Sequence, residues 1–205
     1  MPPGGTQQVI FWARSPIERA TWPKKETALQ RPDPSEYHEY YQSYVDNVPE
    51  GDIIALLPAE AETTLALLRR VPSERADYRY DPEKWGIKDL VGHVIDSERM
   101  FAFRALCFAR NDPTPLPSFE QDLYARFSNA ARRPLPELAE EFTYLRKSNV
   151  FLFKSFDEEM WTRRGIASEV EFSVRALAYI IAGHEIHHRR VLEERYLPGL
   201  LEGDT

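Results

Sequence analysis

The chain has 205 residues, of which 42% are hydrophobic, so it can bury one substantial core and we expect one domain plus an extension. Its net charge of −7 argues against a general nucleic-acid binder, because such proteins usually carry a basic stripe. The single cysteine excludes an intramolecular disulfide, and no apolar stretch approaches the roughly 20 residues that span a bilayer. Since the first residues also lack the pattern of a signal peptide, we expect a cytoplasmic protein that contacts neither nucleic acid nor membrane.

Residues 1–33 combine many prolines with mixed charges and show no sustained period, so we expect an irregular N-terminal extension. The predicted domain spans residues 34–200. It begins at Asp33-Pro34-Ser35-Glu36, where a capping acid, a proline at the first helical position and a glutamate form a helix-start signal. We expect the first helix to follow directly and to continue through residues 51–70, with a break near Pro58. Its expected stripe consists of Tyr37, Tyr40, Tyr41, Tyr44, Val45 and Val48.

The middle of the chain predicts two long helices with an irregular connection between them. After a loop over residues 71–83, apolar residues at helical spacing predict a helix from Trp85 to Ala109. The proline-rich residues 111–117 cannot be helical, and Ser118-Phe-Glu-Gln121 resembles a capping box that starts a short helix. Another long helix is expected over residues 136–156.

The last predicted helix follows a short extended segment. Residues 169–172 alternate between polar and apolar, and Ser173 is placed to cap a helix that ends before Pro198-Gly199. Four long amphipathic helices with almost no strand signal predict an all-α four-helix bundle, in which the central connection crosses over.

Three histidines stand at helical spacing: His93, His184 and His188. Residues four apart lie one above the other on a helix, so His184 and His188 can aim two ring nitrogens at one point and chelate a divalent metal. Both lie in the apolar face of the last helix, which consists of Val174, Leu177, Ile181, His184, His188 and Val191. Buried imidazoles are costly without partners; a metal would satisfy them, and hydrogen-bonded core histidines or a hydrated helix end are the alternatives. His93, near the edge of another apolar face, favours the metal, since ligands from two helices leave positions open for water or substrate.

Polar neighbours of these histidines have two interpretations each. Asp96 follows His93 by three positions, where its carboxylate could orient the imidazole or be solvated. His187 lies about 100° around the helix from His188, so we expect a flanking residue, with a place in the pocket lining as the alternative.

The residues from His184 to His188 also spell His-Glu-x-x-His, the signature of zincin proteases. In a metzincin a glycine and a third histidine follow, but Val191 and Glu194 stand at those positions. Because strands are also nearly absent from the predicted fold, we set the protease aside. Glu185 is then expected to be solvated, or to hold a metal ligand in place without binding the metal itself.

The segment Trp85-Gly-Ile-Lys-Asp-Leu-Val-Gly-His93 resembles the start of the second helix in DinB/YfiT-type four-helix bundles. Residues 174–188 resemble the last helix of the same family, and the resemblance extends over about Ser35 to Leu197. It assigns the metal to the same three histidines. Gly86 stands where the family often has a capping serine, but no ligand position is disturbed.

The resemblance implies two activities, a metal-assisted hydrolase and a transferase that activates a low-molecular-weight thiol. In both, a divalent zinc or nickel ion held by neutral histidines lowers the pKa of a water or a thiol. A non-catalytic metal-binding stress-response protein is a third alternative. We favour the thiol S-transferase, acting on a small-molecule substrate, because the family offers no obvious catalytic side chain beyond the metal; the catalytic residues stay unknown.

The resemblance also suggests a dimer, and the aromatic residues agree with it. Two of the predicted helices carry phenylalanines around more than one face, so a second apolar surface needs a cover, either the extension or a second copy. These residues are Phe101, Phe103, Phe108, Phe151 and Phe153. We therefore expect a homodimer.

Overall fold

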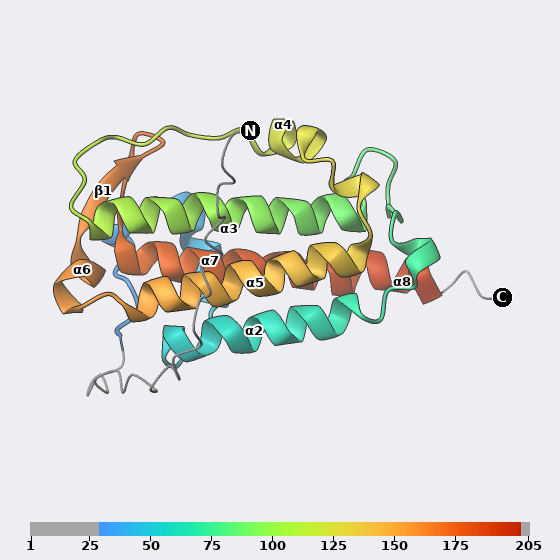
Figure 1. The fold of residues 1–205 in the computed structure, drawn as a ribbon, viewed down its shortest axis with the longest axis horizontal. Coiled ribbons are helices and arrows are strands. Elements are labelled where there is room, and N and C mark those ends of the chain that lie inside the picture. Colours follow the sequence, from blue (N-terminus) through green and yellow to red (C-terminus); the bar gives the residue numbers. More distant parts are fainter. Residues whose placement is uncertain (1–28, 202–205) are drawn as a thin grey trace, which may run out of the picture.

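Four long helices form a bundle in the computed structural model, which describes residues 29–201 (Figure 1). They are α2 at Ile53–Leu68, α3 at Ile87–Ala109, α5 at Leu135–Lys154 and α7 at Val174–Val191. α3 packs against α7 and α5, and α2 packs against the same two helices, so the four close a ring around the core. The predicted all-α bundle is confirmed. The expected extension over residues 1–33 lies largely outside the described residues.

α3 and α5 run in the same direction because the chain between them returns along the bundle (Figure 1). This connection contains the short α4, Gln121–Phe127, and a 3-10 turn at Ala130–Arg132. The predicted crossover is therefore present. The predicted capping box before α4 is wrong, because Glu120 is the N-cap and its side chain makes no capping hydrogen bond.

The two helices that carry the three histidines begin at locally fixed positions. Ser173 caps α7 as predicted, because its Oγ accepts a hydrogen bond from the backbone N–H of Ala176 at 3.0 Å. α3 begins after Gly86, whose backbone N–H donates to the Asp89 carboxylate at 3.1 Å. Asp89 thus closes the helix start from its third position, although no serine stands at the cap.

The structure differs from the prediction over residues 34–48, where the sequence predicts one continuous helix. The chain instead forms 3-10 turns at Pro34–Glu36 and Glu39–Tyr41, followed by the short α1 at Gln42–Asn47. The capping box at the first turn does form. However, the Glu36 carboxylate accepts a hydrogen bond from Ser173 Oγ at 2.7 Å and pairs with Arg175. These contacts with the start of α7 override the local helix signal.

α1 and α2 are separate helices, and the break between them lies earlier than predicted. Gly51 has a φ of 145°, and Asp52 caps α2 by accepting a hydrogen bond from the backbone N–H of Ile54 at 3.1 Å. Pro58 lies inside α2. Since it lies near the start of the helix, it removes a single backbone hydrogen bond and the helix continues through it.

A β-hairpin stands where the sequence predicts only one extended segment. It pairs β1, Arg164–Ala167, with β2, Val170–Ser173, through a two-residue turn in which both residues have positive φ. Leu116 of the crossover bridges to Ala167, with its backbone N–H 2.9 Å from the Ile166 carbonyl. The hairpin and the crossover are therefore joined at one end of the bundle.

The C-terminal segment stays helical beyond the predicted end. A π-helical turn at Leu192–Tyr196 follows α7, and α8 at Leu197–Leu201 includes the proline and glycine expected to stop the helix. The Tyr196 hydroxyl donates to the Trp85 carbonyl at 2.8 Å, which holds this segment on the bundle. The remaining elements are a 3-10 turn at Ser73–Arg75 and α6 at Glu158–Thr162. Within residues 29–201, no helix has the length and apolar character needed to cross a membrane.

Gly183 allows α1 to approach α7 closely beside the histidines. A Cβ atom added at this position would lie 1.8 Å from the carbonyl oxygen of Tyr44. We therefore expect Gly183→Ala to lower the free energy of unfolding by about 1 to 3 kcal/mol, because the backbone of α1 must move away. Thermal and urea unfolding followed by circular dichroism measure the loss. An unchanged midpoint would contradict the close contact.

Candidate metal centre

Three imidazoles meet between α3 and α7. His93 comes from the start of α3, and His184 and His188 come from successive turns of α7. The Nε2 atoms of His93 and His188 lie 3.0 and 3.1 Å from Nε2 of His184. One nitrogen of each residue lies within 4.8 Å of the other two, an arrangement that can hold a metal ion. Among the described residues, this is the one such cluster of three metal-ligating side chains.

Desolvation keeps the three imidazoles neutral, since His93 and His184 are buried and His188 is half-buried. His93 and His184 are 4% and 6% exposed. Burial lowers the pKa of His93 to about 4, and it lowers the pKa of His184 and of His188 well below the usual value. At pH 7 each ring therefore keeps a nitrogen with a free lone pair, which is the form that binds metals.

Hydrogen bonds within the cluster do not satisfy all of its nitrogens. Nε2 of His184 faces two other Nε2 atoms, but a neutral ring nitrogen either donates one hydrogen bond or accepts one. In the described part of the chain, Nδ1 of His188 is buried and has no hydrogen-bond partner. This pattern disfavours a set of hydrogen-bonded core histidines. Three converging neutral imidazoles fit a divalent cation such as zinc or nickel.

Aromatic rings enclose the cluster on two sides. The Trp85 ring centroid lies 4.7 Å from that of His93, and the Tyr44 ring lies 5.4 Å from His184. His187 is half-buried beside the cluster and contacts the same tyrosine, also at 5.4 Å between centroids. Burial raises the pKa of the Tyr44 hydroxyl, which therefore stays protonated at neutral pH. These rings restrict the approach of water to the histidines.

Glu185 is buried, so the expectation that it is solvated is wrong. Its carboxylate lies 2.7 Å from Nη1 of Arg146 and accepts a hydrogen bond from Thr64 Oγ1 at 2.7 Å. Burial raises the pKa of Glu185, and the Arg146 charge opposes that shift. Arg146 also binds Glu98 through two hydrogen bonds of 2.9 Å. The glutamate of the His-Glu-x-x-His pattern is thus engaged in an ion-pair network and not in the role that it has in a zincin.

Asp96 pairs with Arg99 and not with His93, the partner that the sequence suggests. Its carboxylate lies 3.4 Å from Nη1 of Arg99 on the same helix. Burial raises the pKa of Asp96, and the Arg99 charge lowers it. The hydrogen bonds among residues 29–201 include none from Asp96 to His93. Asp96 therefore belongs to the charged surface between α3 and α5.

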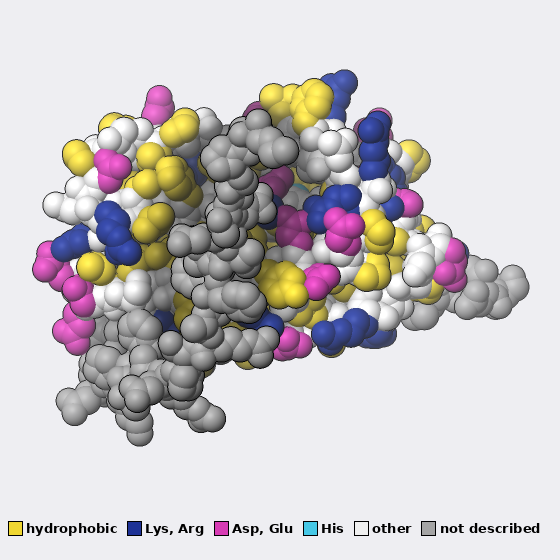
Figure 2. Space-filling view, in the orientation of Figure 1, with side chains coloured by type: hydrophobic (Ala, Val, Ile, Leu, Met, Phe, Trp, Pro, Cys, Tyr) yellow, Lys and Arg dark blue, Asp and Glu magenta, His cyan; other side chains and the backbone are white. Residues whose placement is uncertain are grey.

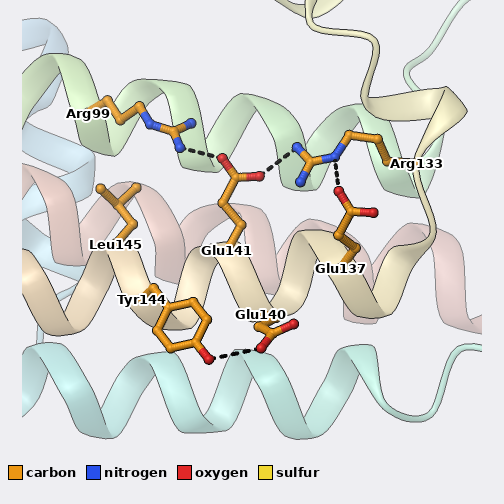
Figure 3. A pocket seen from close by; sticks show the side chains of 7 residues that line it. All are labelled: Arg99, Arg133, Glu137, Glu140, Glu141, Tyr144 and Leu145. Carbon is orange, nitrogen blue, oxygen red and sulfur yellow. Dashed lines mark hydrogen bonds and ion pairs between the residues drawn. The ribbon is translucent and has the colours of Figure 1, made fainter. Parts of the chain in front are cut away.

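That surface contains a hollow of about 660 Å³, larger than the space beside the histidines. Figure 3 shows Arg99 and Arg133 both pointing toward the Glu141 carboxylate, while Arg133 also reaches Glu137 at 2.8 Å. Two arginines and three glutamates line this hollow, and its ion pairs join the arginines to Glu137 and Glu141. Partly exposed pairs of this kind contribute little to stability.

A smaller pocket, of about 210 Å³, opens directly onto His93 and His184. Ser97 and Arg104 line it and were not singled out from the sequence. Both lie on the His93 face of α3, because they follow it by four and eleven positions, and this spacing is the signal that could have identified them. The other lining residues are Tyr40, Tyr41, Tyr44, Phe101, Phe119, Glu120, Gln121 and Ser168.

Comparisons with known proteins agree with this fold. The family model of the DinB superfamily matches residues 56–192. Among solved structures, the chain is similar to YfiT from Bacillus subtilis, described as a probable metal-dependent hydrolase with an unusual four-helix bundle topology. The match has a TM-score of 0.58 and 12% identity, and covers 80% of this chain and 90% of that chain. At that identity it shows the fold alone. Comparison with curated proteins gives no match.

Proposed function

Since this chain belongs to the DinB superfamily, we propose that it is a metal-dependent enzyme in which His93, His184 and His188 hold one divalent cation. The observation that carries the proposal is the convergence of three neutral imidazoles whose nitrogens are not all satisfied by hydrogen bonds within residues 29–201. Imidazole suits both zinc and nickel, so the ligand set leaves the choice of metal to measurement.

We propose hydrolysis of a small-molecule substrate as the reaction. A divalent cation held by three neutral ligands keeps its double charge and supplies the Lewis acidity that lowers the pKa of water toward neutrality. The protein supplies the rest. Trp85 and Tyr44 pack against the histidine rings, and the adjoining pocket holds the substrate. The description of YfiT as a probable metal-dependent hydrolase supports the same reaction class.

The size of the pocket favours hydrolysis over thiol transfer. A transferase must hold a thiol and its acceptor side by side, whereas a hydrolase needs one organic substrate and water. The volume of about 210 Å³ is below the 300 to 1,000 Å³ of typical ligand sites, so it fits one small molecule. Thiol S-transfer, which the sequence analysis favours, stays a prediction. An assay with cellular thiols tests it.

The test begins with protein purified without a histidine tag, whose bound metals are quantified by mass spectrometry. We expect about one divalent ion per chain. The loaded protein is then assayed with chromogenic esters and amides, and separately with cellular thiols plus an electrophile. Hydrolysis that a chelator abolishes and added metal restores would support the proposal. Turnover of thiols alone would establish the transferase. Bound metal without any turnover would establish the non-catalytic alternative. Absence of bound metal would refute the metal centre itself.

We also propose that the protein forms a homodimer through the face formed by α3 and α5. Phe103 is 50% exposed and Phe151 is 67% exposed, whereas Phe101, Phe108 and Phe153 are buried in the core. Figure 2 shows hydrophobic side chains at several places on this face, between charged ones. Exposed aromatic residues of this kind are enriched at interfaces. Light scattering should give twice the chain mass for the wild type and the monomer mass for Phe151→Ser; a wild-type monomer would contradict the proposal.

A further inference from the structure

The pocket beside the histidines contains a buried positive charge for which residues 29–201 supply no negative partner. Arg104 is 1% exposed, and its Nη2 donates hydrogen bonds of 2.9 Å to the Pro117 carbonyl and to Ser168 Oγ. It also contacts the neutral Tyr41 hydroxyl. Among the described residues, no carboxylate lies within ion-pair distance of it, and its Nε has no hydrogen-bond partner. The lining of the pocket therefore includes a desolvated guanidinium to which no described residue supplies an anion.

Arg146 is a second buried arginine, and it differs from Arg104 in having carboxylate partners. Arg146 is 2% exposed, and two carboxylates, Glu98 and Glu185, pair with it at 2.9 and 2.7 Å. Arg104 is equally buried, but no carboxylate of the described part of the chain pairs with it. An unpaired buried charge is costly, and burial lowers the pKa of Arg104, although an arginine still keeps its proton. The cost is explained if a ligand supplies the missing anion.

Arg104 and the histidines lie at opposite ends of the pocket, so an anion bound to Arg104 would lie at some distance from the proposed metal ligands. Arg104 lies on the same face of α3 as His93, roughly 16 Å farther along the helix axis. Its side chain leans back toward the helix N-terminus, and hence toward His93. The Phe101 ring lies between the two ends, 5.8 Å from Cζ of Arg104 and 6.2 Å from the His184 ring. A ligand that spans this gap is a small molecule.

The walls between the two ends are aromatic. Phe101 and Phe119 both lie under the Arg104 guanidinium, at 5.8 and 5.9 Å, and Tyr41 packs edge-on against Phe101. Closer to the histidines, Ser97 is 1% exposed, and its Oγ has no hydrogen-bond partner within residues 29–201. Glu120 lines the pocket but is exposed at its rim. The lining thus combines aromatic rings with one buried cation and with the hydroxyl-bearing side chains of three tyrosines and two serines.

We propose that this pocket binds a small aromatic carboxylate, with its carboxylate on Arg104 and its opposite end directed at His93 and His184. The inference names the substrate class of the proposed hydrolase and rests on that function for the reaction, although not for the binding. The carboxylate accepts from the Arg104 guanidinium, the ring lies against Phe101, and the opposite end lies beside Ser97 near the histidines. Charge-assisted hydrogen bonds of this kind are the strong ones.

The test uses benzoate as the probe and the full chain, titrated by calorimetry both after dialysis against a chelator and after loading with zinc. Benzyl alcohol has the ring without the charge, and inorganic phosphate has the charge without the ring. We expect benzoate to bind at least tenfold more tightly than either control compound in both metal states. Failure to bind benzoate, or equal binding of benzyl alcohol or phosphate, would overturn the inference.

Matched variants locate the binding site. Arg104→Gln should weaken benzoate binding at least tenfold, whereas Arg99→Gln, which removes a surface charge from the same helix, should leave it within twofold. Equal affinities for the wild type and Arg104→Gln would overturn the assignment. If circular dichroism shows that Arg104→Gln does not fold, a wild-type crystal soaked with 4-bromobenzoate replaces it. Anomalous scattering from bromine is expected between Phe101 and the histidines, and bromine found only elsewhere would refute the site.

The two proposals can fail separately. Binding of benzoate that depends on Arg104 in a protein that retains no metal would leave this inference standing and refute the metal centre. Metal-dependent hydrolysis together with a benzoate affinity that Arg104→Gln does not change would support the metal-dependent enzyme and refute this inference.

Discussion

His188→Ala is expected to lower the affinity of the protein for zinc by at least about 100-fold, because removing a direct ligand should cost no less than the largest effects of residues that only support ligands. The Nε2 atom of His188 lies 3.1 Å from that of His184, so its loss leaves two converging nitrogens where there were three. Competition with a fluorescent chelator measures the affinity. Metal content after dialysis provides an independent readout.

His187→Ala is the matched control for this variant. His187 is the adjacent residue on α7, but its ring contacts Tyr44 and does not belong to the cluster. We expect its removal to leave the zinc affinity within about threefold, since only His188 shares a helix face with His184. Equal losses in the two variants would mean that the three-histidine assignment is wrong.

Arg146→Ala is expected to lower the free energy of unfolding by about 3 to 5 kcal/mol. The substitution leaves the buried carboxylates of Glu98 and Glu185 without their shared cation. It also removes the donor to the Leu57 carbonyl, which Nη1 of Arg146 reaches at 2.6 Å. Burial lowers the pKa of Arg146, but the charges of the two glutamates raise it above its usual value. The arginine therefore stays charged in the native state. Urea unfolding followed by circular dichroism measures the change.

Arg133→Ala provides the comparison on the surface. Arg133 pairs with Glu137 and Glu141, but these groups are partly exposed and screened by water (Figure 3). We expect a loss below about 1 kcal/mol. If Arg146→Ala cost no more than Arg133→Ala, the buried network would not stabilise the bundle as its geometry implies.

The long helices could be predicted because their signals are local. Apolar residues at helical spacing located α3 and α5 to within a few residues, and Ser173 marked the start of α7. Residues 34–48 could not be predicted in this way, because Glu36 is held by Arg175, 139 positions later in the chain. The first hairpin strand was missed for a similar reason. It contains Gly165, where a Cβ atom would lie 2.1 Å from the Phe108 ring, so packing against α3 decides its conformation.

In the site too, local signals could be predicted and long-range contacts could not. The pair His184 and His188 follows from a spacing of four, and His93 follows from its place near the apolar face of another predicted helix; the resemblance to DinB/YfiT-type bundles assigns the same three residues. The family is confirmed, and the structure brings the three rings together. Arg104 could not be assigned a role from the sequence alone, because its partners Pro117 and Ser168 come from the crossover and the hairpin turn. A helical spacing locates residues on one face, but it does not say what lies opposite them.

The hairpin and the crossover have a consequence for how such proteins diverge. The histidines are carried by long helices, whereas Phe119 and Ser168, at the far end of the pocket, are carried by connections that are joined at Leu116. Connections accept insertions, deletions and substitutions more readily than packed helices do. Bundles with the same three histidines can therefore acquire different pocket ends through changes in these two segments. Ligand preference can evolve in this architecture without alteration of the metal ligands.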